Sequence, residues 1–444
     1  MQTQLVAENK SLGQTPKDPN HERRALDAIV RAATEIPFYS KRGGVARGDT
    51  LAQTLSGMPI LFKKDVRAAL PKAWVTKDRD TRAELLSGSL ELVETSGSTE
   101  ERLRILWDKG WWLRQEARAM RTNSLVARAM DSVGSPYKEA ILTTPVCGGG
   151  VCHTGDLTFD ERLDEPHLFL NMRPDPTFWA ADDMTRMLDE LARHQTVGLE
   201  ADPAYLAALA EHAHQQGRKI EVGGFVQLTY AQTTQAHLRS IRRAYAGPIF
   251  QLYGASEVGV LFMQGEDGWL HHAPLTTHVE LLRVKVPTPG SVDVALVVVS
   301  TLDRAAQPLL RFVVGDLVSV ANEATARFTT VPSLRSVEGR LQDAVVRPDG
   351  AIVTCAAIDR ALAKIEGLVQ FQLQQREPSA VEIDVVARGD VNADVKRALE
   401  PLLHGVRLEV RSATAIAAEA SGKFRVVRRS FPIDVQATFE AAES

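Results

Sequence analysis

Cysteine is scarce in this sequence: Cys147, Cys152 and Cys355 are the only three in 444 residues. A small, odd number of cysteines in so long a chain excludes a disulfide framework as the main source of stability and favours a reducing, cytoplasmic environment. The chain is also too long for one ordinary hydrophobic core, so we expect a large domain and a smaller one.

Long hydrophobic runs are absent as well. The longest, VALVVVSTL from Val294 to Leu302, is far shorter than the roughly 20 residues that a membrane helix requires, and its β-branched side chains predict a buried strand. Residues 1–20 lack the apolar run of a signal peptide and are expected to form a flexible polar leader. The sequence therefore predicts no membrane span.

Neither sign of charge dominates. The chain has 52 lysines and arginines against 56 aspartates and glutamates, a formal charge of −4 that is spread without large blocks. This balance gives no electrostatic reason to expect nucleic acid or an anionic membrane surface as a partner. A hydrophobic content of 44% is that of an ordinary globular protein.

Short apolar runs alternate with helical patterns between residues 140 and 252. This alternation predicts a mostly parallel sheet with helices on its faces. The stretch from Trp107 to Ala129 is predicted to be one long helix, and after Gly259 the pattern changes to strands joined by turns. The predicted fold class is α/β, with a large N-terminal domain (21–337) of mostly parallel sheets and flanking helices, and a small, mobile C-terminal α+β domain (338–444).

A run of hydroxyl side chains and glycine, Thr95-Ser96-Gly97-Ser98-Thr99, is the most informative stretch. Backbone N–H groups and hydroxyls in such a loop can wrap a chain of phosphates. The loop is not of the G-x-x-x-x-G-K-[ST] type, because the spacing and the lysine are both absent. Taken alone, it is equally compatible with an ordinary Ser/Thr/Gly turn.

A second candidate site follows the strand predicted at residues 249–252. The chain there runs into Tyr253, Gly254, Ser256 and Glu257, at the kind of strand end where open α/β sheets bind ligands. The aromatic ring can stack on a base. The carboxylate can hold Mg²⁺ on ATP, since Mg²⁺ takes one or two carboxylates together with phosphate oxygens. The alternative for Glu257 is a solvated loop glutamate.

Three further motifs place a charged group after a strand or a glycine. Asp316 follows a predicted strand and Gly315, which suits a carboxylate that accepts hydrogen bonds from ribose hydroxyls, although a plain turn aspartate fits equally well. Arg340 lies in the run EGRLQD, and Lys423 lies in the run ASGKFR, which in isolation indicates an exposed turn.

Taken together and in this order, the five motifs resemble those of the adenylate-forming superfamily of acyl-CoA ligases, peptide-synthetase adenylation domains and luciferases. Within it the sequence is most similar to the phenylacetate–CoA ligase branch. That resemblance also covers residues 36–43 (IPFYSKRG), 59–67 (PILFKKDVR) and 297–312 (VVVSTLDRAAQPLLRF), and so spans nearly the whole chain. Each motif alone is weak; their order carries the resemblance.

The resemblance implies a role for each motif residue. Lys423 would be the mobile lysine of the small domain, which bridges the carboxylate of the acid and the α-phosphate, and Glu257 would help to bind Mg²⁺. Asp316 would hold the ribose, and Arg340 would lie near the ribose and the domain junction. The remaining nucleotide-binding residues would be Tyr253 against adenine with Gly254 and Ser256 beside it, and Thr95, Ser96, Gly97, Ser98 and Thr99 around the phosphates.

The activity that the resemblance implies is ATP-dependent activation of a small, aromatic carboxylic acid to an acyl-adenylate, with release of pyrophosphate. The ammonium of Lys423 and Mg²⁺ would offset the repulsion between two anionic reactants. The acyl group would then pass to the thiol of CoA or of an acyl carrier protein after the small domain rotates. ATP, Mg²⁺ and, for the second step, CoA are the expected cofactors.

Some positions depart from the family pattern. Where the family continues the phosphate loop with glycine, proline and a basic residue, this chain has Glu100 and Glu101. Gln232 stands where the family has an acid before the tyrosine motif, and Gln342 stands at the hinge where the first of two acids is common.

These departures leave two alternatives open. One is an adenylating enzyme that passes its acyl-AMP to an amine, a nitrogen nucleophile or a reductase, which the altered hinge favours. The other is a binding protein that keeps the fold without turnover, which Glu100 and Glu101 favour. The retention of Lys423 at the far end of the chain argues against the second alternative.

Cys147, Cys152 and His153 surround three glycines. Two cysteines and one histidine fall short of the four ligands of a structural zinc site, so we expect no metal there. The glycines instead allow backbone or substrate to approach closely.

Overall fold

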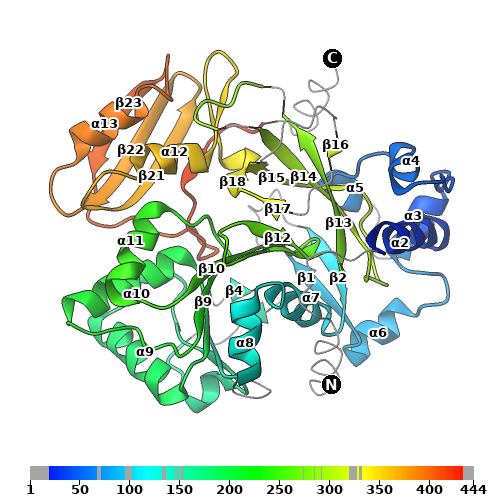
Figure 1. Ribbon diagram of the computed structural model, residues 1–444, viewed down its shortest axis with the longest axis horizontal. Coiled ribbons are helices and arrows are strands. Elements are labelled where there is room, and N and C mark those ends of the chain that lie inside the picture. Colours follow the sequence, from blue (N-terminus) through cyan, green and yellow to red (C-terminus); the bar gives the residue numbers. More distant parts are fainter. Residues whose placement is uncertain are drawn as a thin grey trace.

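The structure is a computed structural model that describes residues 20–67, 72–95, 103–132, 137–144, 146–147, 150–151, 155–273, 275–284, 286–291, 293–319, 328–329 and 333–433. The predicted leader, apart from Asn20, lies outside these residues. Figure 1 shows two sheets at the centre, with the N-terminal helices at one side and a small orange unit from the C-terminal part at the other.

A nine-stranded sheet with a parallel centre is the largest element. Its strands are β17 (Ser333–Leu334), β12 (Leu270–His272), β11 (Gly259–Gln264), β10 (Ile249–Ala255), β9 (Phe225–Leu228), β8 (Gly198–Ala201), β3 (Glu139–Leu142), β7 (His167–Phe169) and β6 (Leu163–Asp164), in that order. The five strands from β10 to β7 run parallel to one another, and the outer strands are antiparallel to their neighbours. The predicted parallel sheet is therefore confirmed.

Helices cover both faces of this sheet, as parallel strands require. They are α9 (Ala181–His194), α10 (Pro203–Gln215) and α11 (Gln235–Ala244) on one face, and α7 (Trp111–Met120) and α8 (Ser124–Ser132) on the other. Along β8, Leu199 packs in the hydrophobic cluster with α9 and α10, so Glu200 next to it faces α7. Asp202 accepts a hydrogen bond from Ala204 N–H, which begins α10 with a proline at its first position.

The long helix predicted from Trp107 to Ala129 was wrong. Strand β2 (Arg104–Asp108) pairs with β1 (Leu90–Glu94), and Gly110, with φ of +68°, then turns the chain into α7. The Asn123 side chain accepts hydrogen bonds from two N–H groups and begins α8 as a separate helix.

A five-stranded antiparallel sheet stands beside the first one. Its strands, in order, are β16 (Phe328–Thr329), β13 (Thr277–Arg283), β14 (Val294–Thr301), β15 (Phe312–Ser319) and β18 (Ser336–Arg340). All eight residues of β14 are buried, as the apolar run predicts. The flanking elements are α2 (His21–Glu35), α3 (Pro37–Ser40), α4 (Leu51–Ser56), α5 (Lys63–Arg67), a 3₁₀ turn (Lys72–Trp74) and α6 (Thr81–Ser87).

The small C-terminal unit is a four-stranded sheet with two helices. Its elements are β19 (Val345–Val346), β20 (Ile352–Val353), α12 (Cys355–Leu362), β21 (Leu368–Glu377), β22 (Ala380–Ala387), α13 (Asn392–Leu399), β23 (Arg407–Ser412) and β24 (Val427–Arg429). The remaining short elements of the chain are β4 (Val146–Cys147), β5 (Gly150–Val151) and the 3₁₀ turns Asp160–Arg162, Pro176–Phe178 and Leu341–Asp343. The boundary predicted at residue 338 falls inside β18, and the division into two domains stays a prediction.

The small unit packs on α10 and α11, above them in Figure 1. Ala204 and Ala236 belong to its hydrophobic cluster. Arg239 of α11 donates to Ala363 O at 2.6 Å, and Gln235 N–H donates to Asp359 Oδ1 at 2.9 Å. Apolar packing and polar contacts together hold the unit against the helices that flank the parallel sheet.

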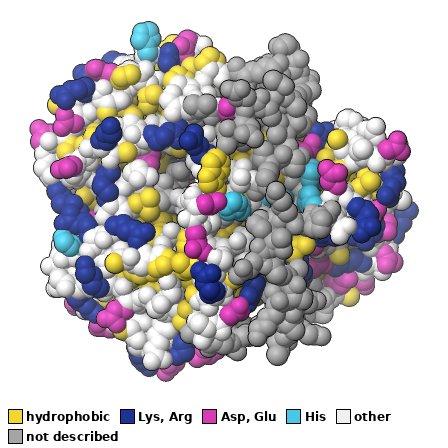
Figure 2. Space-filling model, in the orientation of Figure 1, with side chains coloured by type: hydrophobic (Ala, Val, Ile, Leu, Met, Phe, Trp, Pro, Cys, Tyr) yellow, Lys and Arg dark blue, Asp and Glu magenta, His cyan; other side chains and the backbone are white. Residues whose placement is uncertain are grey.

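The described surface carries mixed charge. In Figure 2, basic and acidic side chains are interspersed over the face that the structure describes, with no single-sign patch covering it. Among the described residues, no helix is long and apolar enough to cross a membrane.

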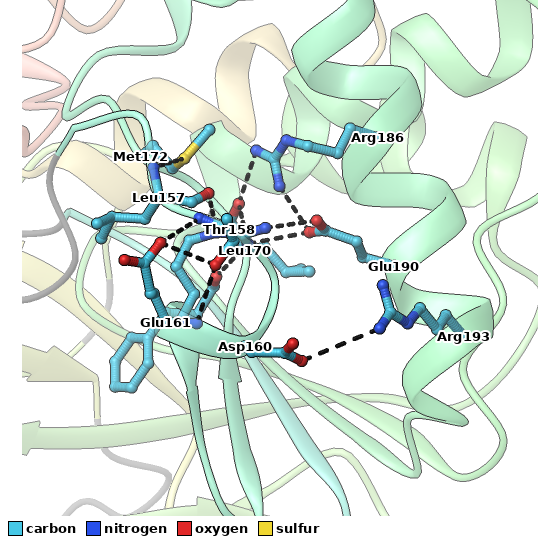
Figure 3. A network of polar contacts seen from close by, with 11 residues as sticks. Leu157, Thr158, Asp160, Glu161, Leu170, Met172, Arg186, Glu190 and Arg193 are labelled. Carbon is cyan, nitrogen blue, oxygen red and sulfur yellow. Dashed lines mark hydrogen bonds and ion pairs between the residues drawn. The ribbon is translucent and has the colours of Figure 1, made fainter.

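A buried ion-pair network joins the β6–β7 hairpin to α9 (Figure 3). Arg162 is fully buried; its guanidinium pairs with Glu190 and also donates to Phe169 O at 2.7 Å. Arg186 adds a second ion pair to Glu190 at 2.6 Å and donates to Leu170 O at 3.0 Å. Every charge in the network has an opposite charge or a carbonyl within hydrogen-bond distance.

Glu190→Gln is expected to lower the free energy of unfolding by about 3–5 kcal/mol, because it leaves the buried Arg162 guanidinium without its counter-charge. Urea unfolding followed by the fluorescence of Trp179, in the neighbouring cluster, measures the change. The control is Asp160→Asn, which removes the surface pair with Arg193 at 4.0 Å in the same figure and should leave the midpoint unchanged. Equal effects of the two substitutions would contradict the prediction.

Candidate active site

A cavity of about 240 Å³ lies at the carboxyl ends of the parallel strands, which is the usual binding position in open α/β sheets. Its walls come from Glu200 of β8, from the segment that follows β9, and from the second half of β10. Strands β15 and β18 and a loop of the small unit complete it. The predicted site residues that line it are Thr95, Tyr253, Gly254, Ser256, Glu257, Asp316, Arg340 and Lys423.

Tyr253, Asp316 and Arg340 meet at one side of the cavity. Asp316 and Arg340 are direct cross-strand partners of β15 and β18, and Arg340 Nε lies 3.7 Å from Asp316 Oδ1. The Tyr253 hydroxyl donates to Asp316 Oδ2 at 2.9 Å. Burial raises the pKa of Asp316, and the Arg340 charge and the Tyr253 hydrogen bond oppose that rise. The sheet register thus brings together three residues that sequence reasoning assigned to one nucleotide.

Glu257 is a cavity carboxylate that its neighbours keep ionised. It is 6% exposed, and Lys63 Nζ of α5 lies 3.3 Å from its Oε1. Burial by itself raises the pKa of Glu257, but Lys63 and Arg340 outweigh burial and lower it below its ordinary value. A single charged carboxylate suits Mg²⁺ that arrives with a triphosphate. Among the described residues, no group of three His, Cys, Asp or Glu could hold a metal by itself.

Thr95 closes the ends of the hydroxyl loop. Its N–H donates to Leu103 O at 2.8 Å, and Leu103 N–H donates to Thr95 Oγ1 at 2.9 Å. These bonds extend the β1–β2 hairpin and place the ends of the loop beside the cavity. Residues 96–102 lie outside the described residues, and with them Ser96, Gly97, Ser98, Thr99, Glu100 and Glu101, so their predicted roles stay predictions.

The loop that carries Lys423 is anchored on the large sheet. Thr144 Oγ1, after β3, donates to Ser421 O at 2.8 Å, and the Tyr205 hydroxyl of α10 donates to Gly422 O at 2.7 Å. Gly422 has φ of +79°, and a Cβ built there would lie 2.3 Å from Thr144 Oγ1 and 2.8 Å from Pro174 O. Only glycine allows so close an approach in this backbone conformation.

Lys423 therefore enters a buried, charged environment. Burial and then the Arg340 charge lower its pKa to about 8, against the carboxylates of Asp202, Glu257 and Asp316, which favour the charged form. Among the described residues, no carboxylate lies within ion-pair distance of Lys423 Nζ. The amino group is mostly charged at neutral pH and is held between several anions rather than paired with one.

The predicted hinge residues bind the C-terminal part of the chain. Gln342 Oε1 accepts hydrogen bonds from Arg429 Nη2 and from Ile433 N–H, both at 3.1 Å. Asp343 forms an ion pair with Arg425, two residues after Lys423. The amide at position 342 thus has defined partners, and the acid at position 343 holds the lysine-bearing segment.

Two further candidates from the sequence are Gln232 and the segment that begins at Cys147. Gln232 lines the cavity, and its Nε2 donates to Val337 O at 3.3 Å. Cys147 lies in β4, but its side chain, together with Cys152 and His153, lies outside the described part of the chain.

Several lining residues were missed by sequence reasoning. Lys63 lies within a segment that carried the family resemblance, which was a usable signal. Asp202 does not line the cavity, but its charge acts on Lys423; it precedes a proline at a helix start and could have been found as a cap. Glu116 of α7 and Glu200 of β8 also line the cavity, and nothing in their spacing marked them.

Comparison with solved structures gives the fold. The structure of 2-hydroxyisobutyryl-CoA ligase in the postadenylation state, in complex with 2-HIB-AMP, matches with a TM-score of 0.64 at 16% identity, over 96% of this chain and 93% of that one. The same ligase with R3-HIB-AMP matches at 0.63 and 17% identity, over 96% and 93%. This chain has the fold of an adenylate-forming CoA ligase. No family model and no curated protein sequence matches it.

The conformation of that ligase affects the match. In an open conformation with 2-HIB-AMP and CoA it matches with a TM-score of 0.52 at 16% identity, over 93% of this chain and 91% of that one.

Gly422→Ala is expected to displace the loop, because the methyl group would overlap Thr144 Oγ1 and Pro174 O. The matched control is Gly405→Ala, where φ is also +79° but no atom lies within 4 Å of the added Cβ. An amine-reactive reagent, with mass-spectrometric detection, should modify Lys423 faster in Gly422→Ala than in wild type or Gly405→Ala. Equal rates in the two variants would contradict the role assigned to this close approach.

The Lys423 amino group is expected to titrate near pH 8 rather than at its ordinary 10.5. The ammonium is thus present below pH 8 and is lost as the pH rises through that value. In Asp202→Asn the midpoint should move further down, because a carboxylate that favours the charged form is gone, whereas asparagine can still cap α10. NMR titration of the lysine side chain in the free protein measures both; a midpoint above pH 10 would contradict the prediction.

Proposed function

We propose that this protein activates a small carboxylic acid with ATP, forming an acyl-adenylate and pyrophosphate. The observation that supports it best is the convergence of Lys423, Glu257, Asp316 and Arg340 on one cavity from three separate parts of the fold. The fold is that of a ligase that has been solved with acyl-AMP ligands. The family likeness of the motifs and the geometry of the cavity thus agree.

Adenylation requires the protein mainly to position the two reactants and to neutralise their negative charge. A carboxylate oxygen of the acid attacks the α-phosphorus, the bond to the bridging oxygen breaks, and pyrophosphate leaves with its electrons; no proton needs to move. Lys423 is proposed to hold the acid carboxylate beside the α-phosphate and to neutralise the charge shared by the two groups. Mg²⁺, when bound, supplies the same neutralisation to the phosphate oxygens.

The other residues are proposed to bind the nucleotide. Asp316 would accept hydrogen bonds from the ribose, with Tyr253 and Arg340 fixing its orientation. Glu257, ionised beside Lys63, would bind Mg²⁺ carried by ATP. The hydroxyl loop that begins at Thr95 would enclose the phosphates.

The acid is proposed to lie between α7 and the ends of β8 and β9. Trp112, Leu228, Tyr230 and Val260 line this part of the cavity. A wall with two aromatic and two aliphatic side chains fits a small acid with an aromatic or otherwise flat, apolar body.

The second half-reaction is proposed to pass the acyl group to the thiol of CoA or of a carrier protein. In the present arrangement the Lys423 loop occupies one wall, so a thiol enters only after residues 338–444 have rotated as a mobile domain. The short contacts of the loop with Thr144 and Tyr205 would break in that rotation. The protein is proposed to act in the cytoplasm.

Exchange of labelled pyrophosphate into ATP, dependent on an added acid, tests the first half-reaction without regard to the acceptor. Lys423→Ala is expected to lower the exchange rate by about 100- to 1,000-fold, as removal of one charge-stabilising donor does elsewhere. Lys364→Ala, on an exposed position of the small unit, is the control and should leave the rate unchanged. An unchanged exchange rate in Lys423→Ala would contradict the role proposed for Lys423.

A further inference from the structure

Three glutamates lie together beside the acid part of the cavity; Glu139 and Glu200 are buried, and Glu116 is half-buried. Glu116 of α7, Glu139 of β3 and Glu200 of β8 all lie between α7 and the same face of the parallel sheet. Gln227 of β9 links two of them: its Nε2 lies 3.4 Å from Glu116 Oε1 and 3.3 Å from Glu200 Oε2. The surroundings are otherwise apolar and aromatic.

Within the described ranges of the chain, the three glutamates have no cationic partner. Among the described residues, no lysine or arginine forms an ion pair with any of the three glutamates. His167 Nε2 lies 3.4 Å from Glu139 Oε2, but burial lowers the pKa of His167, so it is neutral at pH 7. Burial raises the pKa of Glu116, and its hydrogen bonds with Glu200 and Gln227 oppose that rise. Burial and the charge of neighbouring glutamates raise the pKa of Glu200 and bring that of Glu139 to about 8.

The side-chain oxygen of Gln227, beside the same cluster, lacks a hydrogen-bond donor. Gln227 is 0% exposed, and its Oε1 has no hydrogen-bond partner, although its amide end lies among the carboxylates. A buried carbonyl oxygen without a donor is costly and uncommon.

The cluster opens on the cavity at one side. Glu116 and Glu200 line the cavity, whereas Glu139 lies behind them. The Tyr230 hydroxyl, from the loop after β9, donates to Glu200 and also lines the cavity. A group in the acid-binding part can therefore reach two carboxylates without crossing the sheet.

We infer that the carboxylic acid carries an ammonium group at the end remote from its carboxylate, and that Glu116 and Glu200 bind this ammonium. The inference rests on the proposed acid activation and specifies its substrate class. An ammonium has three donors, and the carboxylates of Glu116 and Glu200, which both line the cavity, can accept them. It also supplies the one charge that the buried cluster lacks. The substrate is then a zwitterion whose two ends face Lys423 and the glutamates.

Matched acids that differ only in this charge provide the test. The pairs are para-aminomethylbenzoate against para-ethylbenzoate, meta-aminomethylbenzoate against meta-ethylbenzoate, and δ-aminovalerate against hexanoate. In wild type, the charged member of at least one pair should support pyrophosphate exchange with a kcat/KM at least about tenfold above its neutral partner, as a hydrogen-bonded charge would give. A neutral partner that is equal or better in every pair would overturn the inference and leave the proposed function standing.

Glu200→Gln separates recognition from folding. It should lower kcat/KM for the charged acid about tenfold or more while leaving the neutral partner unchanged or improved, so the preference falls or reverses. Glu221→Gln, at an exposed position, is the control and should keep the wild-type preference. An unchanged preference in Glu200→Gln would overturn the inference. Loss of activity with both members would do the same, because it would indicate a structural role for this carboxylate.

Calorimetry distinguishes this failure from failure of the proposed function. If no acid supports exchange, the same pairs are titrated into the full-length protein without ATP. Tighter binding of the charged member, lost in Glu200→Gln, would support the ammonium site while the activation chemistry fails. Absence of any such difference would overturn the ammonium site as well.

Discussion

The close approach of Gly422 to Thr144 and Pro174 is the contact on which the site depends. The loop belongs to the small unit, yet its lysine has to reach a cavity at the ends of strands in the large sheet. A left-handed glycine without a side chain lets the backbone lie against the segment that follows β3, and Tyr205 then holds the Gly422 carbonyl. A position one or two ångströms further out would leave the ammonium short of the cavity, whatever the surrounding residues were.

The fold was predicted well where burial on both sides leaves a regular pattern. The strands β3, β8, β9 and β10 are short, apolar and separated by helices, so the alternation from residue 140 onward was readable. Helix α9 was not predicted, and the long helix from Trp107 was wrong. In that stretch the aromatic residues of β2 and α7 lie close together in sequence, and only Lys109 and Gly110 separate the strand from the helix.

One part of the site could be predicted from the sequence, because its residues lie in recognisable local motifs. Tyr253, Glu257, Asp316, Arg340 and Lys423 each follow a strand or a glycine, and their order along the chain identified them. The glutamates at positions 116 and 200 lie inside a helix and a strand, where a charged residue ordinarily faces solvent. Their environment depends on which face of β8 packs against α7. This tertiary packing cannot be read from the local sequence pattern.

Charge is divided along the cavity. Lys63, Arg340 and Lys423 gather at the end formed by β15, β18 and the small unit, where the anionic reactants are proposed to meet. Glu116 and Glu200 lie at the other end, with Glu139 behind them. Anions bound at the first end strengthen the positive character that Lys423 needs, since phosphate beside its amino group favours the ammonium form.

At the second end of the cavity, the electrostatic environment favours a bound cation. Three carboxylates in an apolar wall repel one another, and their raised pKa values mean that protons partly fill the place of a missing cation. A neutral acid would leave this cost uncompensated in every bound state. An ammonium removes it at the moment of binding, so the same charge that would be expensive to bury in most cavities is favourable in this one. The cluster therefore destabilises the empty protein and selects the substrate by the same electrostatic interaction.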